Sequence, residues 1–204
     1  MSAEDATLDE GIAGTMPAFG PVPQIAGLMR GFPHPWYIAG GWAVDLYLGR
    51  ETREHDDIDV VILRKDQFEL QRYLTDRAFV KVVDGQRLPW TDRERLDLPV
   101  HEVHATSRNR ARIEFLLNES SGGTWQFRRN LAVTRQLNHI GAQTSTGVPF
   151  LAPEIVLLFK AKSPEAKDAH DFDFVHPRLE NEPRRWLKDA LETCHPGHPW
   201  TARL

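Results

Sequence analysis

Two aspartates, Asp57 and Asp59, stand at the beginning of an apolar run that continues to Leu63. On an extended strand successive side chains alternate between faces, so these two carboxylates project to the same side and can reach one hydrated divalent ion. Mg²⁺ takes oxygen ligands and is usually held by one or two carboxylates together with substrate phosphates. The pair therefore predicts a Mg²⁺ site, the alternative being that the aspartates merely open a strand. Asp56 is expected on the opposite face, in solvent.

A pair of glycines, Gly40 and Gly41, stands upstream of the aspartates. Glycine has no Cβ, so the backbone can approach a ligand closely, and a helix that starts at Trp42 would aim its free N–H groups at an anion. Trp42 could also line a nucleotide pocket. Because the glycines would hold phosphates and the aspartates a metal ion, the two features together predict a site for a triphosphate held on a metal.

A third carboxylate is usually needed where two metal ions clamp a phosphoryl group. Glu114 is our candidate, because it lies within an apolar strand and is costly to bury unless it meets a cation. Two alternatives stay open. Glu114 could be an exposed edge-strand residue paired with Arg110 or Arg112, and Glu119 could supply the third carboxylate instead.

The segment from Trp36 to Asp59 resembles the signature of the polymerase-β-type nucleotidyltransferase superfamily, in the branch similar to aminoglycoside 2''-adenylyltransferases. The residues that carry the resemblance are Trp36-Tyr37-Ile38-Ala39-Gly40-Gly41-Trp42-Ala43-Val44-Asp45, Gly49-Arg50, Arg53, His55, Asp57 and Asp59. The similarity continues through Leu117-Asn118-Glu119, Phe127-Arg128-Arg129, Pro149-Phe150-Leu151-Ala152-Pro153-Glu154, Lys160-Ala161-Lys162 and Lys167-Asp168. The family more usually carries an aspartate as catalytic base or third ligand, so a glutamate at that place departs from its pattern.

This resemblance implies a Mg²⁺-dependent enzyme that moves AMP, or another nucleoside monophosphate, from a nucleoside triphosphate to a hydroxyl group of a small molecule. ATP is the first choice of donor, and aminoglycoside-like compounds are the first choice of acceptor. A polycationic acceptor would also be drawn to the acidic residues of the loop 84–102, which we expect at the rim of the cleft; these are Asp92, Glu94, Asp97 and Glu102.

Further nucleotide ligands are implied by the same resemblance. Lys160 and Lys167 resemble the lysines of a helix that reaches the β- and γ-phosphates, although a solvated helix face is the alternative for such residues. Arg53 could contact phosphate or could anchor its own loop through a carboxylate such as Asp45. His55 shares parity with the two aspartates, but a lone histidine is more often structural.

The pattern of apolar residues predicts an α/β (α+β) fold, with a small mixed sheet flanked by helices. Strands are expected over residues 36–39, 58–63, 79–83, 100–105, 111–117, 125–127, 135–140 and 148–151, and helices over 21–30, 42–48, 66–75, 155–161, 168–175 and 183–193. We expect residues 1–20 to form a mobile tail, 21–151 the nucleotidyltransferase core, and 152–204 a helical unit that closes over the nucleotide.

Composition excludes several classes of protein. The 204 residues suit one compact domain, and a net charge of −4 argues against a nucleic-acid partner. No apolar run approaches membrane length, and the acidic N-terminus is unlike a secretory signal, so we expect a cytoplasmic protein. The single cysteine, Cys194, precludes an internal disulfide, and its spacing to His195 and His198 does not suit structural zinc.

A rival interpretation is a non-catalytic nucleotide-binding or toxin–antitoxin-type regulatory module, or a protein-modifying nucleotidyltransferase, since a fold does not imply a function. The presence of both metal-binding aspartates favours an enzyme. The glutamate in place of an aspartate keeps the rival open.

Overall fold

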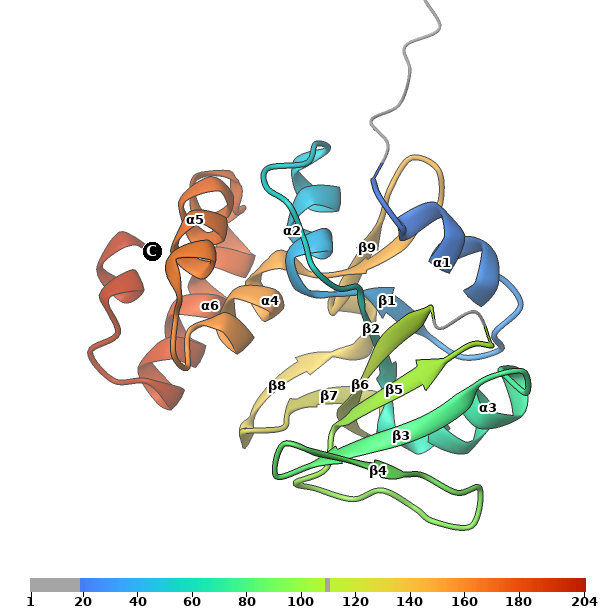
Figure 1. The fold of residues 1–204 in the computed structure, drawn as a ribbon. Coiled ribbons are helices and arrows are strands. Elements are labelled where there is room, and N and C mark those ends of the chain that lie inside the picture. Colours follow the sequence, from blue (N-terminus) through green and yellow to red (C-terminus); the bar gives the residue numbers. More distant parts are fainter. Residues whose placement is uncertain (1–18, 109–110) are drawn as a thin grey trace, which may run out of the picture.

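The computed structural model describes residues 19–108 and 111–204, so the expected tail lies almost entirely outside the described residues, as does Arg110. The described residues form a mixed sheet with helices around it (Figure 1), which confirms the predicted α/β class. The strands are β1 (Trp36–Ile38), β2 (Asp59–Leu63), β3 (Ala78–Val83), β4 (Gln86–Pro89), β5 (Glu102–Thr106), β6 (Arg112–Ser121), β7 (Thr124–Phe127), β8 (Asn130–Gln136), β9 (Gly141–Gln143) and β10 (Pro149–Leu151). The α-helices are α1 (Val22–Met29), α2 (Gly40–Leu48), α3 (Gln67–Tyr73), α4 (Pro153–Lys160), α5 (Ala166–Val175) and α6 (Asn181–Cys194).

The strand order is β4-β3-β5-β6-β2-β1-β10-β9, and β7 pairs with the far end of β6 and with β8. The pairs β2/β6 and β1/β10 are parallel, and the other neighbours are antiparallel. Strand β2 is central, and its residues from Val60 to Leu63 are buried. A strand covered on both faces consists of a continuous run of apolar residues, so β2 could be predicted from the sequence.

The parallel pairing of β2 with β6 places Asp59 directly beside Glu114. On its other side Glu114 lies opposite His104 of β5. Strand β6 is therefore central in the sheet, and the alternative of an edge-strand glutamate is wrong. The ion pair with Arg112 that this alternative included is nevertheless present.

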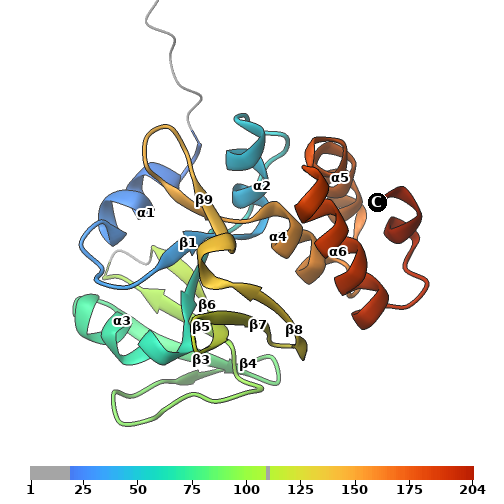
Figure 2. The ribbon, with the colours of Figure 1, turned by 180° about the vertical axis from the view of Figure 1, so that it is seen from behind.

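Helix α2 starts from the glycine turn because Ala39 is extended and Gly40 has a φ of 60°. It ends at Gly49, whose φ of 70° lies in the left-handed region that ends many helices. Figures 1 and 2 show α2 between the sheet and the helices that follow β10, which gather at the C-terminal end of the molecule. In the part of the chain that is described, no helix is long and apolar enough to cross a membrane.

Two short strands, β4 and β9, were not expected from the sequence. Strand β4 follows a turn at Asp84 and Gly85, both with positive φ. An Asp-Gly pair is a strong signal for a two-residue hairpin turn, so β4 could have been found. The strand expected over 135–140 is wrong for most of its length, because β8 ends at Gln136 and a 3-10 turn follows it over Leu137–His139.

Glu119 serves the fold through the buried side chain of Arg64. The guanidinium of Arg64 donates to Glu119 Oε1 at 2.6 Å and to the carbonyl oxygens of Leu96 and Val100 at 3.0 and 2.7 Å. These bonds attach the loop before β5 to the sheet. Glu119 therefore neutralises a buried cation and lies five positions along β6 from Glu114.

We predict that Glu119→Gln lowers the free energy of unfolding by about 3 kcal/mol, because removal of one partner leaves the other charge buried and uncompensated. The measurement is chemical denaturation at pH 7. Glu69→Gln is the control, since the ion pair of Glu69 with Arg72 is exposed and should contribute less than about 1 kcal/mol. Equal losses in the two variants would contradict a structural role for Glu119.

Candidate active site

The carboxylates of Asp57, Asp59 and Glu114 lie near one another where β2 begins. Burial, followed by the charges of Asp57, Glu114 and Glu102, raises the pKa of Asp59 from 3.8 to about 7, against a lowering contribution from Lys160. Asp57 lies in the loop just before the strand and is exposed. The cluster therefore carries negative charge that the described side chains only partly neutralise.

The side chain of Glu114 is held from two sides. Its Oε1 lies 2.9 Å from Arg112 Nη2 and 3.6 Å from His104 Nε2. His104 is buried, and its Nε2 lies 2.7 Å from Glu102 Oε1. Among the described residues, Glu102, His104 and Glu114 form one group that could hold a metal ion, with ligand atoms within 4.8 Å of one another. The alternation of β5 could have revealed the first two, since Glu102 and His104 share a face.

Both glycines of the turn are required by close approaches. A Cβ at Gly40 would lie 2.4 Å from Asp59 Oδ2, and the positive φ there is also unfavourable for other residues. A Cβ at Gly41 would lie 2.3 Å from the ring of His55 and 2.4 Å from Arg53 Nη2. The turn thus brings the start of α2 against the carboxylate of Asp59.

The buried carboxylate of Asp45 ties α2 to the loop that carries Asp57. It accepts from the backbone N–H and the hydroxyl of Thr52 at 3.0 and 2.6 Å, and its Oδ2 lies 2.6 Å from His55 Nε2. His55 packs on Trp42 with ring centroids 4.4 Å apart, and Trp42 Nε1 donates to the carbonyl of Asp57 at 3.0 Å. Trp42 and His55 therefore hold the backbone at Asp57, and neither is among the residues that line the cavities described below.

Lys160 and Arg53 belong to one charge network. Lys160 Nζ lies 2.6 Å from Asp168 Oδ1 and 3.0 Å from Asp171 Oδ2, and Arg53 binds Asp171 with two hydrogen bonds of 3.0 and 3.1 Å. Burial alone would lower the pKa of Arg53, but the bonds to Asp171 raise it overall. The side chain of Asp171 is fully buried, and both cations reach it there.

A cavity of about 220 Å³ opens beside the glycine turn and Asp59. Gly40, Asp59 and Lys160 line it, as predicted residues of the site, and so do three polar residues that the prediction did not include, Asn118, Arg128 and Arg129. The tripeptides containing these three were noted only as part of the family resemblance. Lys167 is not among the lining residues, and its half-exposed ammonium lies 3.3 Å from Glu165.

A second cavity, of about 410 Å³, lies on the other side of the carboxylates and is lined by Asp56, Asp57, Thr106, Arg112 and Glu114. Asp56 is exposed, as expected, but it lines this cavity together with Asp57. Because Asp59 lines the first cavity and its strand neighbour Glu114 lines the second, the carboxylates lie at the boundary between the two.

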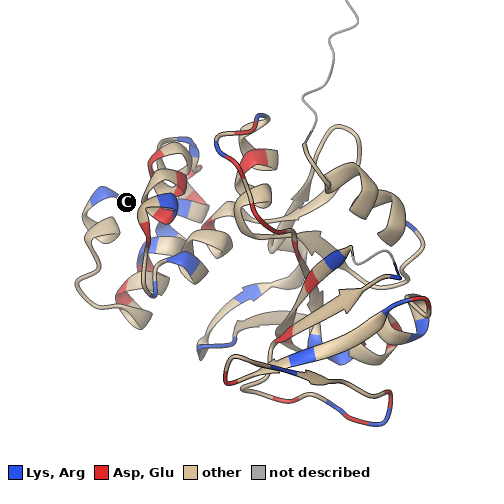
Figure 3. Ribbon diagram, in the orientation of Figure 1, with Lys and Arg blue, Asp and Glu red and all other residues tan. Residues whose placement is uncertain are grey.

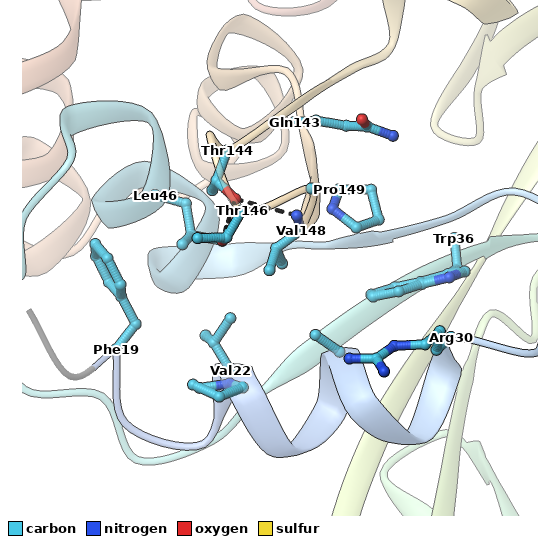
Figure 4. Close-up of a pocket in the computed structure, with 13 residues that line it drawn as sticks. Phe19, Val22, Arg30, Trp36, Leu46, Gln143, Thr144, Thr146, Val148 and Pro149 are labelled. Atoms are coloured by element: carbon cyan, nitrogen blue, oxygen red, sulfur yellow. Dashed lines mark hydrogen bonds between the residues drawn. The ribbon is translucent and has the colours of Figure 1, made fainter. Parts of the chain in front are cut away.

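The largest of these cavities, about 540 Å³, lies elsewhere, between α1 and the hairpin of β9 and β10 (Figure 4). Its walls are mostly apolar, with Trp36 and Pro149 among them, and Arg30 is the only charged residue in its described lining. No carboxylate that could hold a metal ion is among its described lining residues, so we place the candidate site at the smaller cavities.

The expected acidic rim is mostly absent from the site. Glu94 pairs with Lys81, Asp97 pairs with Arg95, and Asp92 lies against α3. These residues belong to the loop between β4 and β5, and β4 lies at the edge of the sheet, with β3, β5 and β6 between it and β2. Of the four rim residues, Glu102 alone reaches the carboxylate cluster.

Structures of known proteins share this fold. The crystal structure of ANT(2'')-Ia in complex with adenylyl-2''-tobramycin matches with a TM-score of 0.57 at 18% identity, over 84% of this chain and 97% of that one. The lincomycin-bound crystal structure of the lincosamide antibiotic adenylyltransferase LnuA matches with a TM-score of 0.54 at 18% identity, over 76% of this chain and 93% of that one. At this level of identity the similarity shows the fold alone.

Sequence comparison identifies the family. A 2''-aminoglycoside nucleotidyltransferase of Escherichia coli is 51% identical over 52 residues, and one of Klebsiella pneumoniae matches equally well. Each match spans 26% of this chain and 26% of the curated relative. The sequence profile of aminoglycoside-2''-adenylyltransferases matches residues 22–174, and because this is well over half of the chain, the protein belongs to that family of nucleotidyltransferase enzymes.

Proposed function

We propose that this protein transfers a nucleoside monophosphate, AMP from ATP in the first instance, to a hydroxyl group of an aminoglycoside-like acceptor. The acceptor oxygen bonds to the α-phosphorus, the bond from that phosphorus to the bridging oxygen breaks, and pyrophosphate leaves. The hydroxyl proton passes to a carboxylate of the site, for which Glu114 is our candidate. The cavity at Gly40 and Lys160 would take the nucleotide, and the cavity at Glu114 would take the acceptor.

The observation that carries this proposal is the placement of Asp59 and Glu114 side by side, next to a helix start that requires glycine. Backbone N–H groups at a helix start attract phosphate, and paired carboxylates attract the metal that accompanies it. The family match, and the adenylylated tobramycin in the related ANT(2'')-Ia structure, support the same chemistry.

The donor set fits Mg²⁺. Asp57, Asp59 and Glu114 would hold it through hard carboxylate oxygens. Burial and the charges of Asp57 and Glu114 raise the pKa of Asp59, so a bound cation would favour its ionised form. When bound, Mg²⁺ supplies charge neutralisation at the reacting phosphate. Arg112 and His104 contact Glu114 and fix its orientation, as residues behind a metal ligand commonly do.

A polycationic acceptor is supported by the second cavity, which has three carboxylates in its lining against one cation, Arg112. Thr106 adds a neutral hydroxyl group. Asp56, Asp57 and Glu114 would therefore attract a polycationic acceptor, a role that we expected from the sequence for the loop after β4. Lincomycin, which the related LnuA binds, belongs in the same test panel as the aminoglycosides.

We predict that Asp59→Asn and Asp57→Asn abolish nucleotide transfer while circular dichroism shows an intact fold, because each change removes a charge at nearly constant shape. Glu114→Gln should lower kcat by roughly 10²–10⁴-fold with little change in nucleotide affinity. The measurement is mass-detected transfer over four nucleoside triphosphates and a panel of hydroxyl-bearing compounds.

Glu119→Gln is the matched control and should keep its turnover when assayed well below its unfolding temperature. If Glu119→Gln loses turnover and Glu114→Gln does not, the roles of the two glutamates are exchanged. Nucleotide binding without transfer to any compound would favour the non-catalytic regulatory module, and transfer to protein alone would favour a protein-modifying enzyme.

A second prediction concerns the dependence of stability on pH. Because the pKa of Asp59 is raised to about 7 in the folded protein, ionising it costs folding free energy, and this cost grows as pH rises from about 4 to about 7. Without Mg²⁺, Asp59→Asn should therefore stabilise the protein at pH 8, by roughly 1–4 kcal/mol, and by about a third as much at pH 5. Mg²⁺ should raise the melting temperature of the wild type and not that of the variant.

Thermal unfolding at both pH values, with and without Mg²⁺, measures this effect. Asp97→Asn, an exposed carboxylate outside the cluster, is the matched control and should show no gain at pH 8. An equal gain for both variants would show that net charge, and not the cluster, is responsible.

A third prediction concerns the acceptor. Aminoglycosides should bind more tightly at low than at high ionic strength, because salt screens the attraction of their ammonium groups to the carboxylates. Titration calorimetry with and without Mg-nucleotide tests this, and binding should be tighter when the nucleotide is present. Asp56→Asn should weaken the salt dependence without removing transfer. If no aminoglycoside binds while a neutral or acidic compound is adenylylated, the acceptor class is wrong and the transfer chemistry stands.

A further inference from the structure

The positive charge of Lys160, which lines the cavity proposed for the nucleotide, is already compensated by carboxylates of the fold. Lys160 contacts two carboxylates, Asp168 and Asp171, and Asp171 is shared with Arg53. Two cations thus meet two carboxylates, and the formal charge of these four residues sums to zero. Asp168 is also engaged in the capping of α5, where it accepts from the backbone N–H of Glu165 at 3.0 Å. Lys160 is therefore fixed in place by the fold before any ligand arrives.

Arg128 differs from Lys160, because its guanidinium has no ion pair or hydrogen bond among the residues that the structure describes. It lies 5.3 Å from the centre of the Phe159 ring, and Arg129 lies 5.5 Å from the same ring. Arg129 donates one hydrogen bond, to the Phe159 carbonyl at 2.7 Å, and is likewise without an ion pair in the described part of the chain. Both arginines line the cavity that contains Gly40 and Asp59.

This pair of cations is costly without an anion. Burial, followed by the neighbouring charges of Arg129 and Arg64, lowers the pKa of Arg128 to about 10, against smaller raising contributions from Glu102 and Glu119. Figure 3 shows basic residues in the turn between β7 and β8, and acidic residues on the segment that leads from α2 into β2. The cavity thus has a negative side at Asp59 and a positive side at the two arginines, with Phe159 as a flat support for their guanidinium groups.

Positive charge continues into an adjoining cavity of about 400 Å³ that shares Arg129. Lys162 also lines it, and no carboxylate is among its described lining residues. The field along this side of the molecule therefore favours an extended polyanion over a single anionic group.

We propose that Arg128, supported by Arg129, is the principal binding residue for the β- and γ-phosphates of the nucleotide, and that Lys160 mainly positions the cavity wall. This inference rests on the proposed function, because it takes the anion to be the triphosphate of the donor. A planar guanidinium supplies paired donors that match phosphate oxygens, and stacking on Phe159 fixes its orientation before binding. The two arginines would then hold one end of the triphosphate, and a metal ion at the carboxylates would hold the other end.

The test uses titration calorimetry of the full chain with inorganic tripolyphosphate and, separately, with MgATP. Arg128→Gln should weaken the binding of both roughly 10- to 100-fold, which is the usual range for a hydrogen bond to a charged group. Arg128→Lys should recover part of the lost affinity, because lysine keeps the positive charge but lacks the paired donors of the planar guanidinium. Arg30→Gln is the matched control, because it removes the same charge from a distant cavity and should leave both affinities unchanged.

Lys160→Gln separates positioning from binding. It should lower the melting temperature, because Asp168 and Asp171 lose their shared partner, and it should weaken tripolyphosphate binding less than Arg128→Gln does. Tripolyphosphate affinity within twofold of wild type in Arg128→Gln, with circular dichroism unchanged, would overturn the inference. If tripolyphosphate binds through Arg128 and no transfer occurs with any acceptor, the inference stands and the proposed function fails.

Discussion

The parallel pairing of β2 with β6 makes two carboxylates, Asp59 and Glu114, neighbours at a largely buried position, and the rest of the site is arranged around that repulsion. Burial removes the water that would screen the charges, so the pKa of Asp59 rises to about 7. A fold usually retains such a cost at places that serve a ligand. The glycine turn, which places a helix start against Asp59, and the arginines across the cavity both fit an occupant that carries a metal ion and phosphates.

Ion pairs within the fold distinguish the charged residues that serve the structure from those that remain available to a ligand. Arg53, His55 and Glu119 are of types that could do chemistry, yet each is engaged by a specific partner within the fold. Satisfied buried charges rigidify a structure, whereas an uncompensated one costs free energy until a ligand binds. By this criterion Asp57 and Asp59 and the two arginines after β7 are left for a ligand, because the described residues offer them no ion-pair partner, whereas Glu114 keeps its ion pair with Arg112.

The network around Asp171 also links the two parts of the chain. Arg53 comes from the loop that carries Asp57, whereas Lys160 and Asp171 come from α4 and α5. The cavity proposed for the nucleotide is likewise lined from both parts, by Gly40 and Asp59 and by Phe159. The C-terminal helices therefore complete the candidate site and hold the loop beside the carboxylates, and a chain without them would lack both the wall and the anchor.

Local sequence determined the aspartate pair, the glycine turn, and most of the strands and helices, because alternation, apolar runs and left-handed glycines act over a few residues. It also nominated both Glu114 and Glu119, without a means to choose between them. The register of β6 against β2 places Glu114 beside Asp59, and the partner of Arg53 lies 118 residues away along the chain. Only the tertiary structure decided these matters, together with the place of Arg128 and Arg129 in the cavity, because strand register and charge pairing depend on contacts between segments that the chain itself keeps far apart.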